Sequence, residues 1–187
     1  MRITKIALFT TLATLMALSS CKKSESTITF DNKKDVIIEL TWTAKKTNGI
    51  SANDYTYTTG HDAVDLDLYI DDANFNGGAS GADFYSNNSG AYYESKTIPS
   101  GATSQKYNIG VVYWTNNITP ASGYHYEISY TYKVYPGGNS GSAKYYNGTI
   151  NTSATGSSHS NAYFSVSLDK SSSGYLFNSI SQFTHIY

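Results

Sequence analysis

An unbroken alternation of apolar and polar residues over 124–134 constrains the fold more than any other feature of this chain. Every second residue there is tyrosine, isoleucine or valine, beginning with Tyr124 and ending with Val134. Side chains on a β-strand point alternately to its two faces, so this period of two predicts a strand with one buried face. We expect the tyrosines to fill a core. The alternative is an exposed strip of rings that stacks on sugars.

Similar patterns recur along the chain between turn-forming residues. Further strands are predicted at 36–42, 64–70, 92–98, 106–115, 144–150, 161–169 and 174–187. Both faces of 106–115 are apolar, which indicates a strand covered on both sides. No segment has a sustained helical period. The expected fold class is therefore all-β, a single antiparallel β-sandwich of jelly-roll or immunoglobulin-like type. Long loops are expected at 43–61, 71–91 and 151–160.

The first twenty residues have the features of a signal peptide. Arg2 and Lys5 precede a short apolar stretch, 6–18, that is interrupted by threonine and too short for a membrane span. The stretch ends in Leu18-Ser19-Ser20-Cys21, which resembles the lipobox of bacterial lipoproteins. That resemblance implies acylation of Cys21 and attachment to a membrane through lipid. Lys22 stands where enterobacterial lipoproteins retained in the inner membrane carry aspartate, so the expected location is the outer membrane.

Three regions are expected: a lipoprotein signal peptide at 1–20, a lipid-anchored flexible tether at 21–34 and a β-sandwich domain at 35–187. The tether is polar and charged, as flexible linkers are. Its start, Lys22-Lys23-Ser24-Glu25, resembles the export tag of Bacteroidetes surface lipoproteins. We therefore expect display at the cell surface, with a periplasm-facing domain as the alternative.

The charge and cysteine content narrow the function further. Cys21 is the only cysteine, so no intramolecular disulfide can form and the sandwich needs its own hydrophobic core. Removal of residues 1–20 leaves no arginine and a net charge of −3. Recognition of nucleic acid usually depends on arginine and a basic patch, so nucleic acid is not an expected partner.

Four segments, in order, resemble the bacterial pre-peptidase C-terminal domains. They are Leu40-Thr41-Trp42, Val64 to Ile70 (V-D-L-D-L-Y-I), Tyr92 to Ile98 and Tyr107 to Tyr113. The resemblance covers roughly residues 36–135 and implies a β-sandwich accessory module for adhesion, targeting or stability. The chain departs from that pattern in its Gly/Ser/Asn-rich insert at 76–91 and in having no attached peptidase. A role in protease processing is therefore not carried over.

Aspartates alternate with the apolar residues of 64–70. If the apolar residues face the core, Asp65, Asp67 and Asp71 share the other face, about 6.6–6.8 Å apart for nearest neighbours. No cofactor is expected to be required, but with further loop oxygens these carboxylates form a candidate Ca²⁺ site, although no EF-hand motif is present. The alternative is a solvated polar face, or carboxylates that cap loop amides.

Five aromatic residues outside the regular core pattern are candidates for ligand binding by exposed rings. They are Trp114, Tyr85, Tyr92, Tyr93 and Tyr135. Aromatic rings with a polar tip suit a surface that binds glycans or proteins.

Catalysis has little support in the sequence. Histidines 61, 125, 159 and 185 form no metal-binding pair, and no G-x-S-x-G motif is present. Glu94 and Glu127 are the candidates for an acid/base pair in glycoside hydrolysis, but nothing in the sequence indicates that they lie close together. The expected function is a non-catalytic binding or adhesion lipoprotein with a glycan or protein ligand. The alternatives are an accessory subunit of an envelope complex and, last, a small hydrolase.

Overall fold

The computed structural model describes residues 28–31, 33–47, 55–57, 64–75, 84–86, 93–115, 125–152, 161–172 and 174–186. These residues form eleven strands and one 3₁₀ turn, η2 (Ser140–Ser142). The strands are β1 (Ile28–Phe30), β2 (Val36–Thr47), β3 (Tyr55–Tyr57), β4 (Val64–Asp72), β5 (Phe84–Ser86), β6 (Tyr93–Ile98), β7 (Lys106–Thr115), β8 (His125–Pro136), β9 (Lys144–Thr152), β10 (Asn161–Ser171) and β11 (Gly174–Ile186).

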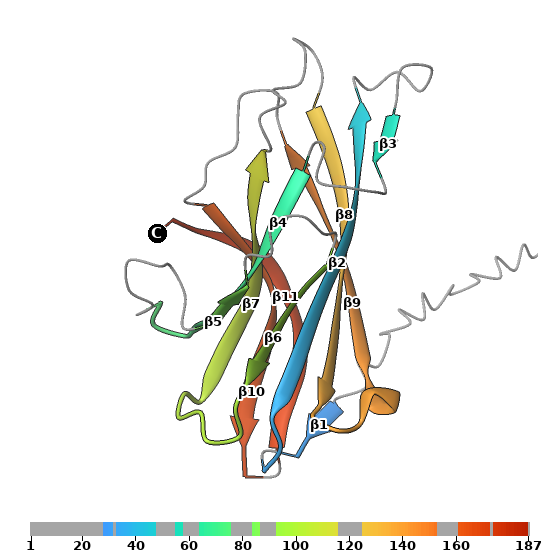
Figure 1. Ribbon diagram of the computed structural model, residues 1–187. Coiled ribbons are helices and arrows are strands. Elements are labelled where there is room, and N and C mark those ends of the chain that lie inside the picture. The colour runs from blue at the N-terminus through green and yellow to red at the C-terminus, as the bar shows by residue number, and fades with distance from the viewer. Residues whose placement is uncertain are drawn as a thin grey trace, which may run out of the picture.

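The strands form two antiparallel sheets packed face to face (Figure 1). Sheet A has the order β1-β11-β10-β7-β4-β5 among the described strands. Sheet B has the order β3-β2-β8-β9, and β6 pairs with β2 on the same side as β3. The expected all-β antiparallel sandwich is confirmed.

The main core lies between the sheets and consists of the apolar side of each strand. β2 contributes Val36, Ile38, Leu40 and Trp42, and β4 contributes Val64, Leu66, Leu68 and Ile70. The alternation in β8 also directs one side of the strand into the core, where Tyr126, Tyr130 and Tyr132 are buried. The expectation that these tyrosines fill the core is confirmed. The Trp42 indole N–H also donates to the Val64 carbonyl oxygen at 3.3 Å, which links the two sheets directly.

A second, smaller apolar cluster covers the other face of sheet A. It is formed by Tyr69, Val112, Ala162 and Phe164, with Phe75 packed against it. Phe75 follows β4 with a φ of 52°, a backbone conformation that is uncommon for phenylalanine. This conformation places its ring 5.2 Å from that of Phe164. β7 is therefore buried on both faces, as its sequence predicts.

At a β-bulge in β10, the apolar residues of the strand change from one of these clusters to the other. Phe164 belongs to the outer cluster, whereas Val166 and Leu168 lie in the main core. Residues two apart normally share a face, but the register shifts between Phe164 and Val166. The shift leaves Ser165 buried, where its hydroxyl lies 2.9 Å from that of Tyr130.

Each predicted strand matches a strand of the structure, with ends that differ by a few residues. Three further strands of three residues each were not predicted. β3 and β5 lie within segments expected to be loops, and β1 lies within the expected tether of 21–34, where it pairs with β11. Pairing with a longer strand satisfies the backbone of these short segments, which no pattern in their own sequence reveals.

Candidate cation site and ligand-binding face

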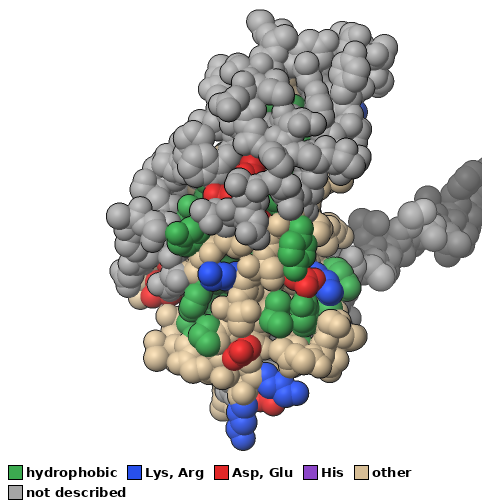
Figure 2. All heavy atoms as spheres, viewed as in Figure 1, with side chains coloured by type: hydrophobic (Ala, Val, Ile, Leu, Met, Phe, Trp, Pro, Cys, Tyr) green, Lys and Arg blue, Asp and Glu red, His purple; other side chains and the backbone are tan. Residues whose placement is uncertain are grey.

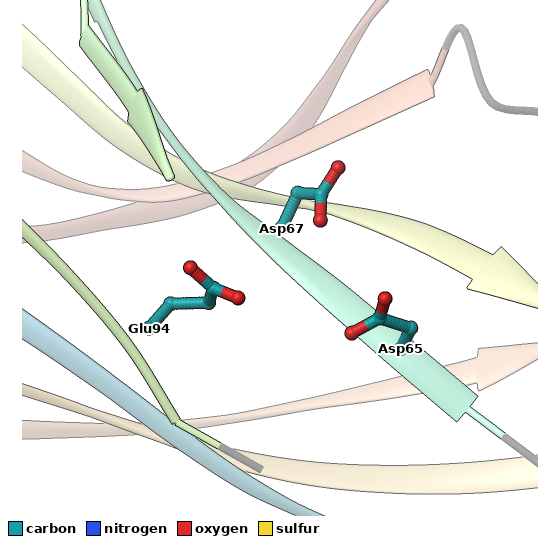
Figure 3. Close-up of side chains that lie close together, drawn as sticks. All are labelled: Asp65, Asp67 and Glu94. Carbon is teal, nitrogen blue, oxygen red and sulfur yellow. The ribbon is translucent and has the colours of Figure 1, made fainter. Parts of the chain in front are cut away.

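Three buried carboxylates converge where the edges of the two sheets meet. Asp65 and Asp67 lie on β4 and Glu94 lies on β6, and one oxygen of each lies within 4.8 Å of the others (Figure 3). Both aspartates are 7% exposed and Glu94 is fully buried. The hydroxyl of Ser86 on β5 donates a short hydrogen bond to Glu94. Three carboxylates at this separation repel one another, and the repulsion is strong where water is excluded.

The burial of β4 contradicts one of the two alternatives to a cation site, namely that its aspartates form a solvated face. Eight of the nine residues of β4 are buried. On the aspartate side, the cluster around Tyr69 and Phe164 covers part of the strand. Beyond it, β6 of the opposite sheet approaches the edge of β4 and brings Glu94 with it. The alternation correctly placed the apolar residues in the core, but it carried no information on what covers the second face.

Asp71 does not belong to this carboxylate cluster. It lies four residues beyond Asp67, about 13 Å along the strand. Its side chain is buried, and its Oδ1 accepts the backbone N–H of Asp72 at 2.8 Å. Of the three residues expected to bind a cation, the structure therefore brings together Asp65 and Asp67. Glu94, which the sequence suggested only as a residue for hydrolysis, is the third carboxylate.

The outer face of sheet B, which points away from the core, carries a cluster of tyrosines around one ion pair. We call Glu39, Tyr93, Lys133, Tyr135 and Tyr145 the aromatic cluster. Lys133 Nζ and Tyr135 Oη lie 2.9 Å and 2.7 Å from the two Glu39 carboxylate oxygens. Lys133 Nζ also lies 4.7 Å from the centre of the Tyr135 ring. In Figure 2, hydrophobic side chains surround an adjacent acidic and basic pair over β2 and its neighbours.

Glu39 is the electrostatic centre of the aromatic cluster. Burial raises the pKa of Glu39, but hydrogen bonds from Lys133, Tyr135 and Tyr93 and the charge of Lys133 outweigh that effect, so the pKa is lowered overall. Lys133 and Tyr135 each donate a hydrogen bond to Glu39, and each bond raises the pKa of its donor. At neutral pH the carboxylate and the ammonium group therefore hold each other, and hold Tyr135, in place.

A shallow depression of about 370 Å³ lies beside the aromatic cluster. The hydroxyl and amide side chains that line it are Thr41, Thr43, Ser129, Thr131, Asn147 and Thr149. These residues alternate with core residues on three neighbouring strands, so they all point to the outer face. The Thr131 hydroxyl donates to Asn147 Oδ1 at 2.8 Å, which leaves the Asn147 amide N–H groups oriented as donors.

The predicted ligand-binding residues do not share one surface. Tyr93 is 41% exposed and, together with Tyr135, belongs to the aromatic cluster. Tyr85 is 36% exposed but lies on sheet A, where its ring centre is 6.1 Å from that of Tyr69. Tyr92 and the side chain of Trp114 lie outside the described residues, as does Cys21.

Sequence reasoning missed Tyr145, which is 62% exposed. It lies opposite Lys133 in the β8–β9 register. A signal was available, because Ile150 is apolar and odd-numbered residues of the same strand must then point outward. Two adjacent tyrosines, Tyr145 and Tyr146, obscured which of them faces the core.

The two glutamates considered for hydrolysis point to different sides of sheet B. Glu94 is fully buried beside Asp65 and Asp67, whereas the Glu127 side chain is half exposed on the outer face, 3.9 Å from His125. A pair of carboxylates flanking one glycosidic bond must face each other. The structure does not bring these two together.

Comparisons with models of known families, with curated proteins and with solved structures give no match for this chain. The resemblance to pre-peptidase C-terminal domains stays a prediction from the four motifs. Within the described residues, no helix has the length and apolar character that crossing a membrane requires.

Proposed function

We propose that this chain is a non-catalytic lipoprotein that displays a β-sandwich glycan-binding module at the outer membrane. The observation that carries the proposal is the outer face of sheet B, where exposed tyrosines lie beside a row of hydroxyl and amide side chains. Binding residues on strands keep their relative positions, because the sheet fixes their spacing. The lipobox at Cys21 and the motif resemblance support the same reading.

A glycan array probed with the mature chain, residues 21–187, tests this proposal. We expect reproducible binding to at least one class of glycan, and no release of reducing sugar from the glycans that bind. Absence of binding to every glycan, together with a stable protein partner that co-purifies from envelope extracts, would favour the alternative of an accessory subunit. Release of sugar that is lost in Glu127→Gln would favour a hydrolase.

We further propose that Asp65, Asp67 and Glu94 hold a Ca²⁺ ion that links the two sheets. The supporting observation is their convergence from β4 and β6 in a buried position. Carboxylate oxygens are the ligands that Ca²⁺ prefers, and a divalent ion would remove the repulsion among them. The module would then be stabilised by the ion without using it in chemistry.

Thermal melting of the mature chain in EDTA and in about 1 mM Ca²⁺ tests the cation proposal. An ion that binds only the folded state should stabilise it by about 1–3 kcal/mol, which raises Tm. The increase should disappear in Asp67→Asn and in Glu94→Gln. Asp71→Asn is the matched control, because Asp71 is buried on the same strand but lies outside the cluster. An unchanged wild-type Tm, or the same increase in all three variants, would rule the site out.

A further inference from the structure

We propose that the ligand is an uncharged polysaccharide segment that lies across the strands of sheet B, with Tyr93 and Tyr145 as its two stacking residues. This inference rests on the proposed glycan-binding function. It adds the site, the direction of the bound chain and the charge class of the ligand.

The charged residues of this face favour a neutral ligand, because they occur as opposite pairs across β2 and β8. Lys133 lies 2.9 Å from Glu39. Lys45 is directly opposite Glu127 in the β2–β8 register. An anionic glycan would have to compete with the two glutamates for these lysines, whereas an uncharged one meets no opposing charge.

Between these two charge pairs, the side chains on the outer face of sheet B suit a ligand that is rich in hydroxyl groups. Besides Trp42, Tyr130 and Gly148, the depression is lined by five outward-pointing hydroxyl side chains and one amide, each able to donate or accept a hydrogen bond. A hydroxyl-rich ligand can exchange bonds to water for bonds to these side chains with little loss.

The spacing of the two tyrosines sets the length of the ligand. Tyr93 lies on β6 and Tyr145 on β9, with β2 and β8 between them. Three spacings between neighbouring strands amount to about 14 Å, and Tyr145 is also offset from Tyr93 by two residues along the strands. A single sugar ring cannot contact both residues at that distance. The site should therefore bind a chain of several sugars more tightly than it binds a monosaccharide.

The Glu39 carboxylate orders one side of the aromatic cluster. The Tyr135 hydroxyl donates to Glu39 at 2.7 Å, and Tyr93 lies close enough to the same carboxylate to help lower its pKa. Less conformational freedom is then lost when a ligand binds. Tyr145, next to Lys133 in the register, completes the opposite side of the cluster.

Affinity electrophoresis of the mature chain tests the inference. The gels contain uncharged polysaccharides (β-glucans, mannan, xylan or starch) or anionic ones (alginate or polygalacturonate). We expect at least one uncharged polysaccharide to retard the protein, to a similar extent with and without about 0.5 M NaCl. Tyr93→Ala and Tyr145→Ala should each weaken binding about tenfold or more. Tyr85→Ala is the control, since Tyr85 is exposed on the other sheet. Circular dichroism checks that each variant is folded.

The possible failures are distinguishable. If retardation is lost in Tyr85→Ala but kept in Tyr93→Ala and Tyr145→Ala, the protein binds glycans elsewhere and this inference is wrong. Retardation by anionic polysaccharides alone, abolished by salt, also overturns it while the proposed function stands. If no polysaccharide and no arrayed glycan binds the wild type, the proposed function fails and the inference fails with it.

Discussion

At the scale of single residues, two glycines are required by aromatic rings on neighbouring strands. Gly110 of β7 is opposite Phe164 of β10, and a Cβ at this glycine would lie 2.7 Å from Phe164 Cδ1. Gly148 of β9 is opposite Tyr130 of β8, and a Cβ there would overlap the Tyr130 ring. Each ring takes the space that the missing side chain leaves. A glycine in a strand, usually a weakness, here allows close packing.

Gly148→Ala is therefore expected to destabilise the protein by about 1–3 kcal/mol, the usual cost of overpacking a core. The Tyr130 ring cannot move aside easily, because it is buried and its hydroxyl is bonded to Ser165. Urea unfolding measures the effect. Gly101→Ala is the matched control, because a Cβ at Gly101 has no neighbour within 4 Å. Equal stabilities of the two variants would contradict this account of Gly148.

At the scale of strands, alternation predicted the long elements and could not predict the short ones. A period of two is visible in β8 over twelve residues, but three residues in β1, β3 or β5 cannot show one. The bulge at Ser165 is also hidden, because A-Y-F-S-V-S-L reads as one regular strand. Only the pairing with β7 and β11 reveals that the apolar residues change faces there.

The carboxylate cluster and the outer face of sheet B were predicted only in part, because alternation reveals the arrangement within one strand and not the contacts between strands. The spacing of the aspartates along β4 predicted that they share one face and could bind a cation. Glu94 could not be placed beside them, because contacts between different sheets leave no periodic signal in the sequence. On sheet B, the strand patterns placed the polar side of β8 outward correctly. The contacts of Glu39 with other outward-pointing residues could not be predicted, because they depend on the register of β2 with β8 and β6.

The pairing of β2 with β8 should make stability depend on pH through Glu39. Its pKa in the folded state is lowered from the ordinary value of 4.5. A lowered pKa contributes stability that is complete above about pH 4.5 and is lost as the pH falls through the folded-state value. Glu39→Gln should therefore cost about 1 kcal/mol at pH 7 and less than that at pH 3, relative to wild type.

Urea unfolding of wild type and Glu39→Gln at both pH values measures this difference. Glu127→Gln on the same face is the control, because the exposed Glu127 should contribute less than about 0.5 kcal/mol at either pH. A Glu39→Gln cost that is the same at pH 7 and pH 3 would show that the loss comes from packing and not from the carboxylate charge.

At the scale of the whole molecule, the sandwich separates two kinds of site. The carboxylate cluster is buried at the junction of β4 and β6, whereas the aromatic cluster lies on the outer face of sheet B. β6 contributes to both, through Glu94 on its inner side and Tyr93 on its outer side. Loss of the proposed Ca²⁺ should therefore loosen the strand that carries one stacking residue.

Lipidation at Cys21 is the prediction that concerns the protein as a whole. We expect the wild-type chain, expressed with residues 1–20, to sediment with outer membranes and to incorporate labelled palmitate. Cys21→Ala should abolish incorporation and move the protein to the soluble fraction, because acyl chains supply the membrane affinity. Membrane association that survives Cys21→Ala would point to a different means of attachment.

The pairing of β1 with β11 limits how far an acylated protein could extend from its membrane. Ile28 already belongs to sheet A. Only seven residue steps then separate it from Cys21, which span at most about 25 Å when fully extended. A tether running to residue 34 would have allowed about twice that distance. The domain would remain close to the lipid surface, so it would capture chains that lie against its own envelope more readily than chains suspended in the medium.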